Sequence, residues 1–172
     1  MYLNKADAIS GSSGQIALYL RIDNKTSATV DMSTVTLRYW YQDEGLGTTL
    51  DLSANYVSIG YSGAGKVESK AVAASGGAGA DHYIELSFTG SLAAQGDKAT
   101  NDQFNIQITL HTANYQGKVD VTNDYSYMAG TGWDEKITLH DKSGKVIWGA
   151  APGAGAVVTI PDAGVDPSVS GG

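Results

Sequence analysis

Three residues with hard oxygen donors stand close together in the second half of the chain: Asp120, Asn123 and Asp124. Two aromatic residues, Tyr125 and Tyr127, follow them at once. Calcium-type cations need six to eight oxygen ligands, and carboxylates and amides at short, irregular spacing are the usual local contribution. Asp and Asn also form turns, because their side chains bond the backbone and tolerate left-handed conformations. The run therefore predicts either a turn or a metal-binding loop, and both alternatives stay open.

Other candidate chemistry is weaker. Asp43-Glu44 and Asp134-Glu135 are adjacent carboxylates, and neighbouring strand residues point to opposite faces, so neither forms the facing pair that a glycosidase needs. Gly60-Tyr61-Ser62-Gly63 is followed by Ala64, which breaks the nucleophile-elbow pattern. The sequence has no cysteine, which excludes a thiol nucleophile and a zinc–thiolate site. We predict that the chain is not an enzyme.

The composition and net charge of the chain limit the classes of partner that it can bind. The 172 residues suffice for one domain, and 22 glycines with 17% charged residues indicate a globular protein rich in turns. The net charge of −7 would repel nucleic acid and anionic membranes, and no apolar run approaches the roughly 18 residues of a membrane span. The same acidity suits a cation and a neutral glycan. The first residues lack the apolar region of a signal peptide, and we expect the chain to be part of a larger protein.

Apolar and polar residues alternate with period two in several segments, which predicts half-buried strands. These segments are 15–22, 35–42, 83–88 and 104–111. Two further strands, 136–140 and 145–149, flank the hairpin turn 141–144, and 71–80 is predicted to be a loop. Strands with one apolar face need a second sheet to cover it. The predicted fold is an all-β antiparallel sandwich.

The end of the chain differs from the rest. All three prolines, Pro152, Pro161 and Pro167, follow Gly149 in a segment rich in Ala, Gly, Val and Ser. Such a composition is typical of interdomain linkers. We therefore expect a domain over residues 1–150 and a linker tail over 151–172.

Several motifs in this order resemble the family 3 carbohydrate-binding modules, the cellulose-binding modules of cellulases and cellulosomal scaffoldins. The motifs are Val30–Ser33, Leu37–Tyr41, Tyr83–Gly90, Asn123–Tyr127, Trp133–Asp134 and Val146–Gly149. The resemblance spans roughly residues 15–150. It implies a nine-stranded jelly-roll with one structural calcium, carried by a monomeric module of a secreted bacterial protein.

The resemblance also implies the calcium ligands. The family's positions fall here on Gln42, Glu44, Asp120, Asn123 and Asp124. Gln42 and Glu44 depart from the usual Thr and Asp, and Glu44 is one methylene longer than Asp. The acidic run is therefore expected to bind calcium.

A planar strip of an acid, aromatic rings and an arginine binds cellulose in this family, because flat rings stack on the C–H faces of glucose. The corresponding positions here, with neighbouring substitutes, are Asn55, Tyr56, Tyr61, His111, Asn114 and Tyr115. The strip arginine falls at Thr109, and His111 is the nearest polar substitute. Loss of the arginine and of the acid predicts weaker binding or a preference for less ordered glucan.

The opposite outward face resembles the family's shallow groove, which is proposed to hold a glycan chain or a linker peptide. Its expected residues are Arg38, Trp40, Tyr83, Glu85, Tyr125 and Tyr127, with Tyr19 and Arg21 beside them. The alternative is a ladder of side chains that satisfy one another across strands. Trp133 and Trp148 are assigned to packing.

Two functions follow as expectations. The first is a non-catalytic module that targets an attached enzyme, scaffold or sensor to cellulose or a related β-glucan. The alternative is an accessory module of a glycoside hydrolase that packs on the catalytic domain and binds crystalline cellulose weakly or not at all. Neither function needs nucleic acid or a membrane as partner.

Overall fold

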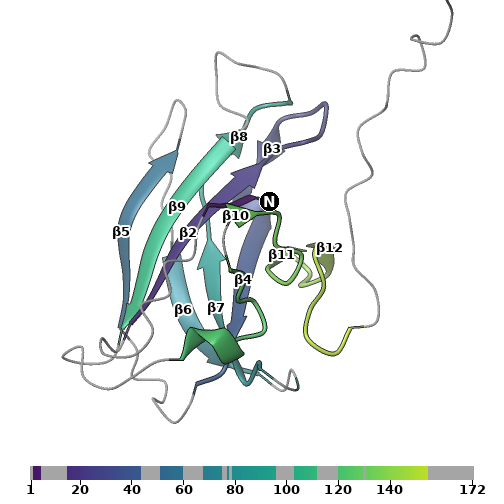
Figure 1. Ribbon diagram of the computed structural model, residues 1–172. Helices are drawn as coiled ribbons and strands as arrows, with labels where there is room; N and C mark the ends of the chain where they lie inside the picture. Colours follow the sequence, from purple (N-terminus) through teal and green to yellow (C-terminus); the bar gives the residue numbers. More distant parts are fainter. Residues whose placement is uncertain are drawn as a thin grey trace, which may run out of the picture.

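The computed structural model describes residues 2–4, 15–43, 51–59, 68–74, 77, 79–95, 103–111, 120–129 and 131–154. Two five-stranded antiparallel sheets face each other in a sandwich (Figure 1). The first sheet, called sheet A, has the order β10 (Thr131–Gly132), β1 (Tyr2–Asn4), β2 (Gln15–Asp23), β9 (Gln103–His111) and β5 (Asp51–Ile59). The second, called sheet C, has the order β12 (Val146–Trp148), β11 (Thr138–Asp141), β4 (Val35–Tyr41), β7 (His82–Ser87) and β6 (Glu68–Ala73).

Short elements close the ends of the sandwich. β3 (Val30–Asp31) pairs with β8 (Ser91–Leu92) as a separate two-stranded ribbon. Two 3₁₀ turns, η1 (Met32–Thr34) and η3 (Val121–Asn123), precede β4 and β10 in the chain. In the described residues no helix is long and apolar enough to cross a membrane.

The core lies between the sheets and follows the predicted alternation. Leu37 and Tyr39 of β4 are fully buried, and their register partners Leu86 and Ile84 of β7 are fully buried too. Leu20 of β2 meets them from sheet A, in the same cluster. Burial of each such side chain contributes about 1.5–3 kcal/mol relative to exposure. These contacts hold the two sheets together.

The predicted all-β sandwich and its strands are confirmed. Segments 15–22, 35–42, 83–88 and 104–111 correspond to β2, β4, β7 and β9, and the 141–144 hairpin joins β11 to β12. The predicted loop 71–80 is wrong at its start, because β6 continues to Ala73. The described residues contain twelve strand segments, several only two or three residues long, so the expected count of nine is not confirmed.

The β11–β12 hairpin shows why its sequence turns where it does. The Asp141 carboxylate accepts hydrogen bonds from the amides of Ser143 (2.8 Å) and Lys145 (3.0 Å). Gly144 has φ +82°, and an added Cβ there would meet nothing within 4 Å. Gly149, which follows β12, has φ +84°, but a Cβ there would collide with the carbonyl oxygens of Ile137 and Glu135. The two glycines therefore differ in packing rather than in conformation.

We predict that Gly149→Ala is more destabilising than Gly144→Ala. Both substitutions place alanine in the left-handed region, which costs about 1–2 kcal/mol. Gly149→Ala adds overpacking against two carbonyl groups, for a total of about 3 kcal/mol or more. Urea unfolding of both variants measures the difference, and equal losses would contradict the close approach at Gly149.

Candidate functional site

The loop that contains the acidic run begins with a capped turn. Asp120 lies before η3, and its Oδ1 accepts hydrogen bonds from the amide (3.0 Å) and the hydroxyl (2.5 Å) of Thr122. These bonds hold the pKa of the exposed Asp120 carboxyl below its ordinary value. The side chain of Asp120 therefore performs the local turn function that the sequence left open.

Asp124, at the other end of η3, is buried and fastens the loop to β4. Its Oδ1 accepts a hydrogen bond from the amide of Gln42 (2.9 Å), and its Oδ2 accepts one from the hydroxyl of Tyr39 (3.2 Å). Burial, together with this carboxylate, raises the pKa of Tyr39 well above its ordinary value. The structure thus brings two predicted ligands, Gln42 and Asp124, together.

Two further carboxylates, Asp43 and Asp81, which were not among the expected calcium ligands, lie close by. Asp81 accepts hydrogen bonds from the Asp43 amide (2.7 Å) and from the Gln42 side-chain amide (2.5 Å). Burial raises the pKa of Tyr41, and the charges of Asp43, Asp81 and Asp124 raise it further. Asp43 stands between the expected ligands Gln42 and Glu44, and this position could have identified it as a candidate from the sequence. Asp81 is 39 residues from Gln42 in the sequence, and no local pattern pointed to it.

The chemistry of these donors suits a hard cation. Carboxylates and the Gln42 side-chain oxygen are the ligand types that calcium takes, and Asp124 Oδ1 and Oδ2 each accept a hydrogen bond, from the Gln42 amide and from the Tyr39 hydroxyl respectively. Asn123 is exposed on the same loop, and its carbonyl lies close to Gly79 of the loop that carries Asp81. Within the described ranges, no three His, Cys, Asp or Glu side chains are arranged to hold a metal ion. Glu44 lies outside the described residues.

The expected groove residues of β4 and β7 contact one another on sheet C. Arg38 Nε donates to Glu85 Oε2 at 2.9 Å, and the Arg38 guanidinium lies 4.5 Å from the centre of the Tyr83 ring. The rings of Tyr83 and Trp40 are 4.8 Å apart. These contacts form the cross-strand ladder that was the alternative to a ligand groove.

Trp40 is buried, and its indole N–H begins a chain of polar contacts. Its indole N–H donates to Thr138 Oγ1 at 3.0 Å, and Thr138 Oγ1 lies 2.8 Å from His140 Nε2. His140 Nδ1 lies 3.1 Å from the Gly144 carbonyl, so a neutral His140 protonated at Nδ1 satisfies every member. Burial lowers the pKa of His140, which favours this neutral form.

The other two expected groove residues, Tyr125 and Tyr127, lie in the loop after η3 rather than on β4 or β7. The hydroxyl of Tyr125 donates to the Ala150 carbonyl at 3.1 Å, and the Lys136 ammonium lies 5.5 Å from its ring centre. Tyr127 packs against the hydrophobic core. Both residues therefore connect the loop to the body of the sandwich.

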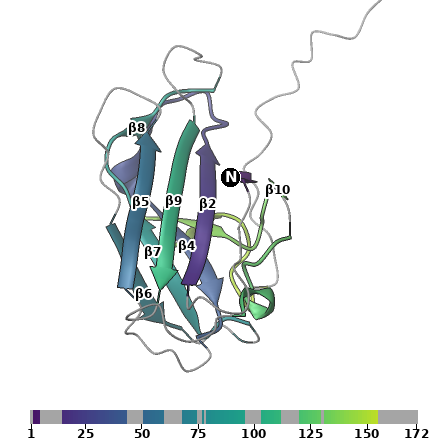
Figure 2. The ribbon, with the colours of Figure 1, turned by 60° about the vertical axis from the view of Figure 1, so that its left-hand side comes forward.

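Three of the expected strip residues, Asn55, Tyr56 and His111, belong to strands of sheet A, which Figure 2 shows face-on. Tyr56 of β5 is opposite Gln107 of β9, which is opposite Tyr19 of β2. Asn55 is the extra residue of a bulge between Ala54 and Tyr56. His111 ends β9, paired with Gln15 and Asp51, whereas Tyr61, Asn114 and Tyr115 lie outside the described residues.

The assignment of Tyr19 and Arg21 to the groove face is wrong. Both residues belong to β2 of sheet A, and Arg21 is opposite Asn105 of β9. Arg21 therefore shares a face of the sheet with Tyr56 rather than with Arg38. An arginine is thus present on the strip sheet, although Thr109 occupies the expected position.

Trp133, assigned to packing, is instead exposed to 47%, whereas Trp148 is buried as expected. Lys25 approaches the Trp133 ring, with its ammonium 5.7 Å from the ring centre. Trp133 directly follows β10, at the edge of sheet A.

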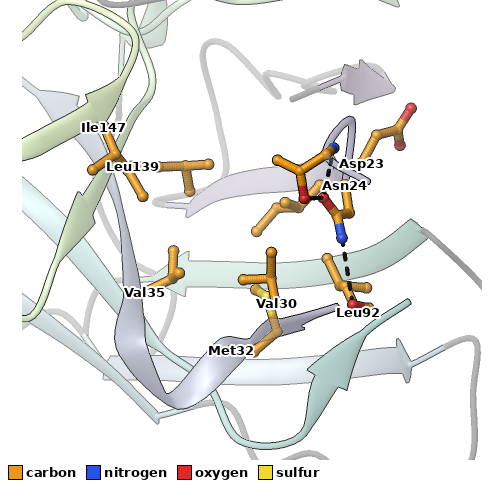
Figure 3. Close-up of a pocket in the computed structure, with 10 residues that line it drawn as sticks. Asp23, Asn24, Val30, Met32, Val35, Leu92, Leu139 and Ile147 are labelled. Atoms are coloured by element: carbon orange, nitrogen blue, oxygen red, sulfur yellow. Dashed lines mark hydrogen bonds between the residues drawn. The ribbon is translucent and has the colours of Figure 1, made fainter. Parts of the chain in front are cut away.

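An apolar cavity of about 250 Å³ lies beside the β3–β8 ribbon (Figure 3). Val30, Met32, Leu92 and Leu139 line it, together with Asn24, whose side-chain amide donates a hydrogen bond to the Ala93 carbonyl at 2.7 Å. A sugar needs several polar partners placed around it. The aliphatic walls do not suit a glycan.

Asp134, next to Trp133, is a buried carboxyl. Its Oδ1 accepts a hydrogen bond from the Lys136 amide at 2.9 Å, and its Oδ2 is buried with no hydrogen-bond partner among the described residues. Burial raises the pKa of Asp134 to about 6. The native protein therefore holds a proton here at pH values where the unfolded chain does not.

The described residues thus form a two-sheet antiparallel β-sandwich with charged and aromatic side chains in contact on sheet C. The family described as "Cellulose binding domain" matches residues 3–149. The chain therefore belongs to family 3 of the carbohydrate-binding modules, which is a non-catalytic family.

Individual relatives agree with this family. A β-mannanase/endoglucanase A of Caldicellulosiruptor saccharolyticus is 31% identical over 88% of this chain, and cellulosomal-scaffolding protein A of Acetivibrio thermocellus is 28% identical over 90%. The matched parts are 11% and 9% of those proteins, so the chain spans about a tenth of their length. A family 3b scaffoldin module of Bacteroides cellulosolvens has the same fold, with a TM-score of 0.74 and 28% identity over 88% of this chain and 95% of that module.

We predict that Asp134→Asn changes how stability depends on pH. An unfolded aspartate has a pKa of about 3.9, so unfolding releases the extra proton and Asp134 makes stability fall as pH rises from 4 to 7. Relative to wild type, the variant should gain about 2 kcal/mol between these pH values.

Unfolding at pH 4 and pH 7 measures this gain. Asp141→Asn is the control, because hydrogen bonds from Ser143 lower the pKa of Asp141 and its contribution has the opposite sign. A gain of zero for Asp134→Asn would show that Asp134 ionises normally.

Proposed function

We propose that this chain binds cellulose, or a related β-glucan, on the outer face of sheet A and thereby targets an attached module to it. The register that puts Tyr56, Gln107 and Tyr19 in one row across three neighbouring strands carries the proposal. Rings and amides in one row on a sheet match a flat polysaccharide surface, since the rings stack on sugar faces and the amides bond hydroxyls. Asn55, Tyr61, His111, Asn114 and Tyr115 complete the proposed surface.

The relatives indicate the setting. Those named above include an endoglucanase and a cellulosomal scaffold, and this chain matches a tenth of each. We propose that the chain is likewise one monomeric module of a larger extracellular bacterial protein. Binding would then raise the local concentration of that protein's catalytic or scaffold modules at the insoluble substrate.

An accessory role on a catalytic domain is the second candidate. The observation that favours it is Thr109, which cannot offer the bidentate charged donor that an arginine supplies. The cross-strand ladder on sheet C also favours the accessory role, because Arg38 already donates a hydrogen bond to Glu85.

We predict that the chain is depleted from solution by amorphous cellulose and less by crystalline cellulose. Tyr56→Ala and Tyr115→Ala should each weaken binding about fivefold, because each removes one stacking ring. Tyr83→Ala, on sheet C, is the matched control and should bind as wild type does. No depletion by either cellulose would reject targeting, and a loss confined to Tyr83→Ala would move the site to sheet C.

We further propose that calcium binds beside the loop of Asp124. Gln42, Glu44, Asp120, Asn123 and Asp124 would hold it, with Asp43 and Asp81 adding negative charge nearby. The support is the buried Asp124 carboxylate and the clustering of oxygen donors around Gln42. Calcium would supply positive charge that offsets the repulsion between these carboxylates.

We predict that a chelator lowers the melting temperature and that added calcium restores it. A ligand at 100 times its dissociation constant stabilises by about 2.7 kcal/mol, which corresponds to roughly 5–10 °C for a domain of this size. Asp124→Asn should abolish the response. Asp31→Asn is the matched control, because Asp31 caps η1 as Asp120 caps η3. If neither chelator nor calcium changes the melting temperature, the acidic run forms a turn and does not bind the metal.

A further inference from the structure

The exposure of the three tryptophans differs sharply. Trp40 and Trp148 are 7% and 8% exposed, whereas Trp133 is 47% exposed and is the one exposed large hydrophobic residue among those whose side-chain burial the structure describes. An exposed indole beside a cation is a common feature of ligand surfaces, because its face can accept both apolar and cationic contacts.

A charged cluster stands beside this ring. Asp23 is buried, and its Oδ1 lies 2.8 Å from Arg21 Nε while its Oδ2 lies 3.3 Å from the Lys25 ammonium. The side chains of Arg21 and Lys25 stay 27% and 42% exposed. A buried carboxylate thus holds two partly exposed cations at the surface, where a ligand can reach them.

The register places this cluster on sheet A. Gly132 of β10 is opposite Leu3 of β1, which is opposite Leu20 of β2, and Tyr2 is opposite Arg21. Trp133, one residue beyond Gly132, is therefore level with the row of Tyr2 and Arg21. β10 and β5 are the two edges of the sheet, and four strand spacings of about 4.8 Å separate them. Trp133 and Tyr56 thus lie at opposite edges of the sheet, and Arg21 lies on the central strand between them.

We propose that Trp133, with Lys25 and Arg21 held by Asp23, is a second pyranose-binding position of a neutral β-glucan at the β10 edge of sheet A. The proposal rests on the proposed cellulose binding and adds a site to it. The indole would stack on one sugar ring, and the two cations would donate hydrogen bonds to its hydroxyl groups. Asp23 offsets one of the two positive charges, which suits an uncharged sugar better than a polyanion.

The test uses the intrinsic fluorescence of the whole chain. Because Trp40 and Trp148 are buried, acrylamide quenching reports mainly Trp133. Saturating cellohexaose should reduce the quenching constant at least twofold, and Trp133→Ala should bind amorphous cellulose about tenfold more weakly. Trp133→Phe should recover part of the affinity. Lys25→Met should lose about threefold, whereas Lys142→Met, an exposed lysine of the hairpin, should lose nothing.

The outcomes separate the two proposals. If wild type binds cellulose but Trp133→Ala binds equally well, or if cellohexaose leaves Trp133 fully quenchable, the second position is rejected and the targeting function stands. If wild type binds neither ligand, both proposals fall. Affinity only for glucuronate-bearing oligosaccharides that disappears at high salt would also reject the neutral site, since hydrogen bonds to uncharged sugars are little screened. Circular dichroism of each variant confirms folding.

Discussion

The buried carboxylate of Asp124 is the contact on which the candidate calcium region depends. A buried charge costs several kcal/mol unless donors compensate it, and here the Gln42 amide and the Tyr39 hydroxyl do so. Two residues further along, Ser126 is fully buried. Its hydroxyl accepts a hydrogen bond from the Trp40 amide and donates one to the Lys136 carbonyl. The acidic run is therefore joined to both β4 and the segment before β11. The turn and metal alternatives are compatible, because Asp120 caps the turn while Asp124 faces inward.

The outer faces of the two sheets differ in how their polar and aromatic groups are arranged. On sheet C the charged and aromatic groups are already paired, with Arg38 on Glu85 and Trp40 on Thr138. A ligand would have to replace these bonds, and a buried partner left unpaired costs about 1–3 kcal/mol. On sheet A, Tyr56 and Arg21 share a face with the exposed Trp133 at its edge. The energetics therefore favour sheet A as the glycan surface and sheet C as structure.

Alternation in the sequence was sufficient to predict the core but not the grouping of strands. Leu37 and Ile84 face inward as their period-two pattern requires. The same pattern cannot say which sheet a strand joins, which is why Arg21 was placed with Arg38. β5 went unpredicted because the bulge at Asn55 interrupts its period. Asp81 joins Gln42 across 39 residues of chain, a tertiary contact that no local motif signals.

Charge is separated along the molecule in a way that the net value of −7 conceals. Asp43, Asp81 and Asp124 gather near Tyr41, whereas Arg21 and Lys25 gather around Asp23 on sheet A. A cation at the first cluster would bind the native state and raise the folded fraction by mass action. It would not touch a glycan on sheet A, because its proposed ligands come from the segment that follows β4 and from residues 120–124. Calcium would then act on the amount of folded module, while the rings and donors of sheet A set the affinity of each folded molecule.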